Sequence, residues 1–240
     1  MTQALYLQAA QYIRSRIESG EYPIGSQIPT ENELAQLLHI SRPTVRQALD
    51  SLTREGYLDR RKGCGTFVRE PKVVHESTTF LTGYREESRK HNRTLRTQVL
   101  SLLKEPAPAH VAQALELKPG EQVTRLTRLR HLENYHNNAP VVYTTLYVPL
   151  RLFPEMCRVN FTDASFYEVL SAQGLEVKHA SRRLEVVPPP AKVAAGLGIS
   201  PFEPVIFITS RGSTGAMVPV EYTESYYPAG SSSFFIEINH

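Results

Sequence analysis

The stretch TENELAQLLHISRPTVRQALDSLTREGYLDRRKGCGTFV, residues 30–68, predicts two short helices, a tight turn and two strands. Thr30 followed three residues later by Glu33 is the pattern of a capping box: the hydroxyl accepts from the third helical amide and the carboxylate accepts from the cap's own amide. A helix should therefore begin here. We expect its buried side to carry Leu34, Ala35, Leu37 and Leu38.

A second helix is predicted to follow a turn at residues 39–41 and to run to about Glu55. Ser41 can cap this helix, and Pro43 in the first turn removes only an amide that would lack an intrahelical partner. Its apolar residues recur at three- and four-residue spacing, which predicts one buried face; they are Val45, Ala48, Leu49 and Leu52. Gly56 can close the helix in the left-handed conformation.

With that apolar face turned inward, the start of the second helix presents a polar surface made of Arg42, Thr44, Arg46 and Gln47. Two arginines four residues apart lie on one side of a helix. Such a segment suits the major groove of DNA, where an arginine can donate twice to a guanine edge. A solvated helix face that carries arginine by chance is the alternative, and the helix alone leaves both readings open.

Residues 57–68 add a predicted strand, a basic turn with glycines and a second strand. Glycines at the tip let the backbone approach a sugar-phosphate chain or a minor groove, and Arg61 and Lys62 supply positive charge for phosphates. This wing and the two helices together predict a winged helix-turn-helix. A preceding helix over residues 5–19 should complete its core.

These motifs closely resemble the DNA-binding head of the GntR family of bacterial transcription regulators. The matching segments are Pro29-Thr30-Glu31, the run from Ser41 to Leu49, Glu55-Gly56 and the run from Arg61 to Val68. The resemblance implies that Arg42 and Arg46 read bases and that Gly63 approaches the minor groove. Some members carry a further DNA-contacting arginine where this chain has Asn32. The predicted DNA-binding residues are Thr30, Asn32, Ser41, Arg42, Thr44, Arg46, Gln47, Arg61, Lys62 and Gly63.

Length and charge fit a DNA-binding head attached to a second domain. The chain has 240 residues and a net charge of only +3, which excludes a general polycation. Residues 39–69, however, hold 7 Lys and Arg against 3 Asp and Glu, so positive charge gathers at the predicted groove-binding elements. We expect a head at 1–69, a linker at 70–77 and a second domain at 78–240.

The two cysteines, Cys64 and Cys157, are too few for a disulfide framework and match no zinc pattern. We expect no metal and no cofactor. Cys64 in the wing is either a redox switch on DNA binding or a bystander. The first residues lack the apolar run of a signal peptide, and no segment approaches membrane-spanning length, so the sequence predicts a cytoplasmic protein that does not enter a membrane.

The second domain reads as an α+β fold on an antiparallel sheet. Strands are expected at 95–103, 123–132, 140–148, 175–187, 204–211, 217–227 and 233–238, and helices at 82–91, 109–115, 164–172 and after Pro190. This order resembles the UTRA domain found in the HutC branch of the GntR family, whose fold is similar to chorismate lyase. The matching motifs include Arg128-Leu129-Arg130, Tyr147-Val148-Pro149, Ser165-Phe166-Tyr167-Glu168 and Pro219-Val220-Glu221.

Strict alternation in strand 123–132 places Leu126, Arg128, Arg130 and Leu132 on one face. Two arginines between leucines are costly to bury unless an anion meets them, which favours a phosphate or carboxylate ligand; the alternative is a solvent face whose arginines pair with nearby glutamates. The resemblance implies that these arginines bind the anionic group of an effector. The predicted effector site comprises Thr82, Gly83, Tyr84, Arg128, Arg130, Thr144, Ser165, Glu221 and Tyr227. Thr144 stands where many sugar-phosphate-binding relatives carry glutamate.

Together these features predict a ligand-responsive transcription regulator, most readily a repressor of a catabolic or uptake operon. A small head binds specific sites best as a homodimer on an inverted repeat of double-stranded DNA. The predicted effector is a small anionic metabolite such as a sugar phosphate. The alternative is a chorismate-lyase-like enzyme with a DNA-binding head, for which Glu221 is the candidate acid or base.

Overall fold

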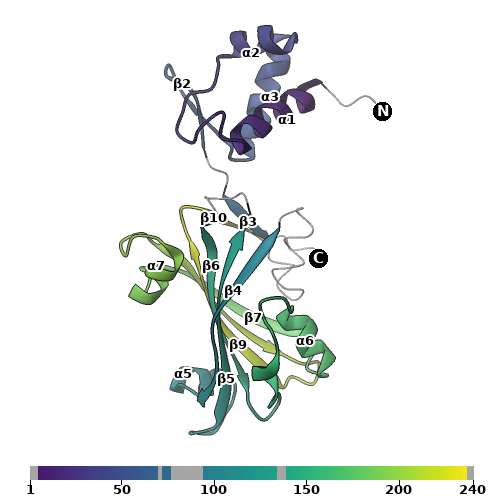
Figure 1. The fold of residues 1–240 in the computed structure, drawn as a ribbon, viewed down its shortest axis with the longest axis vertical. Helices are drawn as coiled ribbons and strands as arrows, with labels where there is room; N and C mark the ends of the chain where they lie inside the picture. Colours follow the sequence, from purple (N-terminus) through teal and green to yellow (C-terminus); the bar gives the residue numbers. More distant parts are fainter. Residues whose placement is uncertain (1–4, 70–71, 77–93, 134–138, 237–240) are drawn as a thin grey trace. The chain divides into compact units, whose positions relative to one another are not determined.

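The computed structural model describes residues 5–69, 72–76, 94–133 and 139–236, and the chain divides into two compact units (Figure 1). The first unit spans Met1–Lys72 and the second spans Val73–His240. The predicted linker at 70–77 therefore overlaps the second unit, because Val73–Glu76 form a strand, β3.

The first unit is a winged helix-turn-helix. Its elements are α1 (Leu5–Glu18), α2 (Glu31–Leu38), α3 (Arg42–Arg54), β1 (Leu58–Arg61) and β2 (Gly65–Val68). The two strands pair antiparallel, with Arg61 opposite Gly65 at the tip. The apolar faces of the three helices meet in one core, whose fully buried members include Ile13, Leu34, Val45, Leu49 and Leu52.

The local signals in residues 30–56 act as predicted. The Thr30 hydroxyl accepts from the Glu33 amide and the Glu33 carboxylate accepts from the Thr30 amide, so the capping box is complete. Ser41 caps α3, and Gly56 has a φ of 85°. The prediction for Leu37 was wrong, because its side chain is 54% exposed. The two turns of α2 bury only a narrow stripe centred on Leu34, and Leu37 falls outside it.

The second unit is built on a six-stranded antiparallel sheet in the order β4-β5-β6-β9-β8-β7. The strands are β4 (Leu95–Pro106), β5 (Gln122–Leu132), β6 (Pro140–Pro149), β7 (His179–Val187), β8 (Val205–Ser213) and β9 (Pro219–Pro228). The helices are α5 (Ala109–Ala114), η3 (Met156–Arg158), α6 (Phe166–Ala172) and α7 (Ala191–Leu197). These elements confirm the predicted α+β class.

Several predicted boundaries shift. The strand expected from Leu175 begins at His179, and the helix expected from Ala164 begins at Phe166. β10 occupies Ser232–Phe235 and pairs in parallel with β3, a contact that the sequence reading missed. The helix predicted at 82–91 lies outside the described residues.

The two faces of the sheet are covered differently. On one face α5 packs beside Val123 and Tyr147, and α7 beside Leu129 and Tyr143. On the other face lie α6 with η3 at one end and the β3–β10 pair at the other, and Figure 1 draws α6 on the opposite side of the sheet from α5 and α7. Between the apolar clusters of this second face, β5 and β6 place Arg128 opposite Thr144. A polar zone thus interrupts an otherwise apolar layer.

Candidate functional site

A cleft of about 660 Å³ lies in the first unit where α2 and α3 begin beside the wing. It contains seven of the predicted DNA-binding residues: Thr30, Asn32, Arg42, Arg46, Arg61, Lys62 and Gly63. Segments that are distant in sequence therefore form one concave basic surface. Ser41, Thr44 and Gln47 are not among its lining residues.

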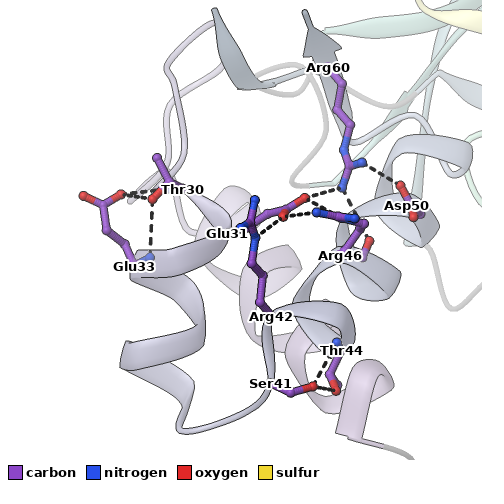
Figure 2. Close-up of polar contacts among 9 residues, drawn as sticks. All are labelled: Thr30, Glu31, Glu33, Ser41, Arg42, Thr44, Arg46, Asp50 and Arg60. Atoms are coloured by element: carbon purple, nitrogen blue, oxygen red, sulfur yellow. Dashed lines mark hydrogen bonds and ion pairs between the residues drawn. The ribbon is translucent and has the colours of Figure 1, made fainter. Parts of the chain in front are cut away.

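Three arginines converge on Glu31, the first residue of α2 (Figure 2). Arg42 Nε donates to Glu31 Oε2 at 2.9 Å. Arg46 donates twice, from Nε to Oε1 at 3.1 Å and from Nη2 to Oε2 at 3.0 Å. Arg60 of β1 places Nη2 3.6 Å from Oε1. One carboxylate thus fixes the positions of two arginines of α3 and one of the wing.

The hydrogen bonds from Arg46 and Arg42, together with the positive charges of these residues, lower the pKa of Glu31 to about 2. Glu31 is therefore ionised at neutral pH. The three arginines outnumber its single charge, so the cleft keeps positive potential for an anionic partner.

Arg60 was not predicted as a site residue. It also pairs with Asp50, through Nη1 and Oδ1 at 2.8 Å, and it donates to the backbone carbonyl of Arg46 at 3.4 Å. Strand alternation carried a signal for it, because Arg60 shares a face of β1 with the buried Leu58 and must point toward α3.

The other predicted DNA-binding residues of the head either help to cap α3 or are exposed at its surface. The Ser41 hydroxyl accepts from the Thr44 amide and lies 2.7 Å from the Thr44 hydroxyl, so both side chains form part of the N-cap of α3. Gln47 is exposed. In the wing, Arg61 bonds to Asp59 and stacks over Phe67, with its guanidinium carbon 4.5 Å from the ring centre.

The wing tip exposes Lys62 and Gly63, and Gly63 has a φ of 75°, which a residue with a side chain rarely adopts. The exposed start of α3, the arginine cluster and this tip form an arrangement that can enter a DNA groove while contacting flanking phosphates.

A second site lies in the polar zone on the face of the sheet in the second unit. Arg128 is only 3% exposed, so the face that carries the two arginines is turned into the domain rather than toward solvent. Arg130 is half-buried on the same face. The guanidinium of Arg128 lies 6.0 Å from the ring centre of Phe166 in α6. α6 thus lies over Arg128.

Glu221 is the buried acid of this zone, with 1% of its surface exposed. Tyr167 donates to its Oε1 at 2.9 Å and Thr223 donates to its Oε2 at 2.6 Å. Burial raises the pKa of Glu221, while these two bonds and the charges of Arg182 and Arg128 lower it in part. Gly212 on β8 makes room for it, because a Cβ there would lie 2.7 Å from the Glu221 carboxylate.

Three other predicted effector residues are distributed over β6, β9 and the start of α6. Thr144 and Ser225 place their hydroxyls 3.3 Å apart, and Tyr227 packs edge-on against His75 of β3 with ring centres 4.7 Å apart. Ser165 is buried at the start of α6 and makes no capping bond with its side chain. Thr82, Gly83 and Tyr84 lie outside the described residues.

The sequence reading missed three members of this zone: Tyr167, Thr223 and Arg182. Arg182 of β7 donates from Nε to the Ser210 hydroxyl at 3.2 Å. Alternation with Glu221 could have identified Thr223. Nothing local indicates Arg182, because its strand reaches the site only through β8.

The described residues hold no group of three or more His, Cys, Asp or Glu that could bind a metal. None of the described helices is long and apolar enough to cross a membrane. Cys64 and Cys157 are both free thiols, and Cys64 is exposed.

Comparison with known proteins identifies both units. Residues 5–68 match the family model of bacterial regulatory proteins, gntR family, and residues 90–231 match the UTRA domain. The chain is 34% identical to the uncharacterized HTH-type transcriptional regulator YurK of Bacillus subtilis, over 76% of this chain and 74% of that protein. It is 32% identical to a histidine utilization repressor of Pseudomonas aeruginosa, over 88% and 82%.

Among solved structures, PhnF from Mycobacterium smegmatis has the same fold, with a TM-score of 0.82 at 23% identity over 96% of this chain and 98% of that one. The Bacillus subtilis and Pseudomonas aeruginosa relatives are named as a transcriptional regulator and a repressor, and the two family models together extend over both units. The chain therefore belongs to the GntR family of bacterial transcription regulators and carries a UTRA domain after its helix-turn-helix head.

Proposed function

We propose that this protein is a repressor that binds an inverted-repeat operator as a homodimer and responds to a small anionic metabolite in its UTRA domain. The observation that carries the proposal is the basic cleft, where Arg42 and Arg46 lie on the exposed start of α3 beside the wing tip. The name of the Pseudomonas aeruginosa relative supports repression of a catabolic operon. A regulator of bacterial DNA acts in the cytoplasm.

Arg42 and Arg46 are proposed to leave Glu31 in part and donate to base edges in the major groove. Arg61, Lys62 and Gly63 at the wing are proposed to contact phosphates and the adjacent minor groove. Thr30, Asn32, Ser41, Thr44 and Gln47 flank these groups and complete the proposed surface. Because Ser41 and Thr44 are already joined in the cap, we assign them phosphate contacts rather than base readout.

The effector is proposed to place its anionic group against Arg128 and Arg130 and its neutral part against Thr144, Glu221 and Tyr227. Support comes from the burial of Arg128, which suits a desolvated anion, and from the carboxylate of Glu221, which can accept from a hydroxyl or an amine. Sugar phosphates and amino-acid derivatives both have this combination. Since the relatives are regulators, no catalytic role is proposed for Glu221.

DNA binding is tested by fluorescence anisotropy with a duplex from the protein's own promoter region and with a random duplex. Arg42→Ala and Arg46→Ala should each weaken operator binding by about 1 to 3 kcal/mol. Arg54→Ala is the matched control, because Arg54 is an exposed arginine in the last turn of the same helix and outside the cleft. Unchanged operator affinity in both cleft variants would remove the proposed recognition surface.

Effector binding is tested by a thermal-shift screen of anionic metabolites on the wild type and on Arg130→Ala. A true effector should stabilise the wild type and lose most of its effect in the variant. Arg125→Ala is the control, because Arg125 is on the opposite face of β5 and pairs with Glu105 at 3.0 Å. If no phosphate or carboxylate raises the melting temperature, the two arginines do not form an anion site.

A further inference from the structure

Glu31 contacts its three arginines in two different ways. Arg42 and Arg46 donate to its two carboxylate oxygens through hydrogen bonds of 2.9 to 3.1 Å. Arg60 Nη2 lies 3.6 Å from Oε1, just beyond hydrogen-bond distance. Arg60 therefore adds positive charge beside the carboxylate, while the two arginines of α3 take its hydrogen-bonding positions.

The proposed contacts with DNA disturb this arrangement. When Arg42 and Arg46 turn toward the bases, Glu31 loses the donors that now hold its oxygens. The side chain of Glu31 is only 19% exposed, so water replaces these donors incompletely, and a carboxylate left in such a position without a partner is unfavourable. Unless another cation neutralises it, Glu31 competes with DNA for the two arginines.

Arg60 is placed to neutralise Glu31 after that release. Its Nη2 approaches Oε1, the same oxygen that accepts from Arg46 Nε, so the departure of Arg46 frees an acceptor beside Arg60 (Figure 2). Arg60 is itself held in place, because its Nη1 lies 2.8 Å from Asp50 Oδ1. The side chains of Arg42 and Arg46 are 57% and 53% exposed, whereas that of Arg60 is 33% exposed. The cluster thus contains two arginines that can turn outward and one that is anchored.

We propose that Arg60 is a positioning residue for DNA recognition: it neutralises Glu31 when the two arginines of α3 turn to the bases, and so lowers the free energy needed to release them. This assignment rests on the proposed function and deepens it, because Arg60 strengthens operator binding without itself contacting DNA. The wing then acts in two ways. Its tip contacts the DNA, while β1 controls how readily α3 releases its arginines.

The charges of the cluster support this exchange. Once two arginines are committed to the bases, Arg60 remains between two carboxylates, and each of its terminal nitrogens faces one of them: Nη1 faces Asp50 and Nη2 faces Glu31. The planar fork of a guanidinium can serve both acids at once. The effect of residue 60 on DNA binding should therefore depend on the charge at residue 31.

A double-mutant cycle in the full-length protein tests this dependence. Arg60→Ala should weaken operator binding about tenfold in the otherwise wild-type protein, because Glu31 then retains the arginines of α3. Combined with Glu31→Gln, the same substitution should have little effect, since a neutral amide needs no counter-ion. Fluorescence anisotropy with the operator duplex measures the dissociation constants of all four proteins.

The salt dependence of binding separates this role from a phosphate contact. Removal of a cation that neutralises a phosphate lowers the slope of log affinity against log salt by about one. Arg60→Ala should leave this slope unchanged, because Arg60 acts on Glu31 and not on the DNA. Arg60→Lys keeps a positive charge beside Glu31 and should recover most of the affinity that Arg60→Ala loses.

Arg61→Ala is the matched control. Arg61 is the next residue of β1 and lines the same cleft, but it pairs with Asp59. Its substitution should weaken operator binding by the same factor with and without Glu31→Gln, and it should lower the salt slope. Circular dichroism melts check that each variant is folded, and Arg60→Gln replaces Arg60→Ala in the cycle if the latter unfolds.

Three results would overturn the inference: no loss of operator affinity in Arg60→Ala, an equal loss with and without Glu31→Gln, or a lower salt slope. Failure of the proposed function gives a different result. If Arg42→Ala and Arg46→Ala bind the operator as the wild type does, the recognition surface is wrong and the role of Arg60 falls with it. If these variants bind weakly and the cycle shows no coupling, the proposed function stands and only the role of Arg60 is lost.

Discussion

The hydroxyl of Tyr167 in α6 donates to Oε1 of Glu221 in β9 at 2.9 Å and so joins the covering helix to the sheet through a buried carboxylate. Burial raises the pKa of Glu221 above its ordinary value of 4.5. The folded protein therefore holds a proton on Glu221 more tightly than the unfolded chain does. Its contribution to stability is full below about pH 4.5 and is lost as the pH rises through the folded pKa.

Glu221→Gln should remove this pH dependence, since an amide cannot ionise but can still accept from Tyr167. The melting temperature of the variant relative to that of the wild type should increase from pH 4 upward and then level off. Glu168→Gln, at an exposed position in the same helix as Tyr167, is the control. Parallel melting curves for wild type and Glu221→Gln from pH 4 to 8 would contradict the assignment.

Gly212 leaves the space that Glu221 occupies. An alanine there would place its Cβ 2.7 Å from Cγ and Oε1 of Glu221 and 3.0 Å from Val177. Overpacking of this kind destabilises a core by about 1 to 3 kcal/mol. Chemical denaturation should show that loss for Gly212→Ala and almost none for Gly215→Ala, whose nearest atom is Lys178 Cγ at 3.7 Å. Equal stability of the two variants would show that Glu221 can move aside freely.

Glu31→Gln should reduce the preference for operator over random DNA. The neutral amide holds Arg42, Arg46 and Arg60 less firmly, so these arginines are less well ordered for reading the bases of the operator. The loss of a negative charge also strengthens the attraction of the cleft to the phosphates of any DNA. We expect the ratio of the two affinities to fall about tenfold, the size of one charge-assisted hydrogen bond.

Anisotropy titrations at two salt concentrations measure this ratio. Glu55→Gln is the control, because Glu55 also pairs with an arginine, Arg14, but lies outside the cleft. An unchanged ratio in Glu31→Gln would mean that the carboxylate does not orient the arginines.

Two substitutions at Ser41 distinguish its role in capping α3 from its proposed contact with DNA. Ser41→Ala should destabilise the head by about 0.5 to 2 kcal/mol, because the Thr44 amide loses its acceptor. Ser41→Asp keeps the acceptor and should keep the stability, but its charge should weaken binding to DNA of any sequence. Thermal melts measure the change in stability, and titrations with random duplex measure the change in DNA affinity. Undiminished DNA binding by Ser41→Asp would place Ser41 away from the phosphates.

The head was predictable almost throughout because its signals are local. A capping box at Thr30, a cap at Ser41 and a glycine at 56 fix the helix ends within a few residues of sequence, and helical spacing put Arg42 and Arg46 on one side. The role of Glu31 was not predictable, because it depends on how α2 and α3 cross. The error at Leu37 has the same origin, since spacing alone does not set the width of a buried stripe.

In the second unit, alternation placed Arg128 and Arg130 together, but alternation could not decide which face is buried. The order of the strands in the sheet is harder to predict from the sequence, because pairing between distant strands leaves no local pattern. Arg182 reaches Glu221 only because β8 lies between β7 and β9, and β3 was missed because four residues beside a proline resemble a linker.

The parallel pairing of β3 with β10 affects the order in which the two units can fold during synthesis. The amide of Val73 donates to the carbonyl of Ser231 at 2.7 Å, so the first strand of the second unit has no partner until a segment much later in the sequence has been synthesised. The hydrophobic core of the head is formed by residues within 5–69, so the head can fold while the rest of the chain is still being translated. A nascent chain thus carries a finished DNA-reading module before the strand that follows it has a partner.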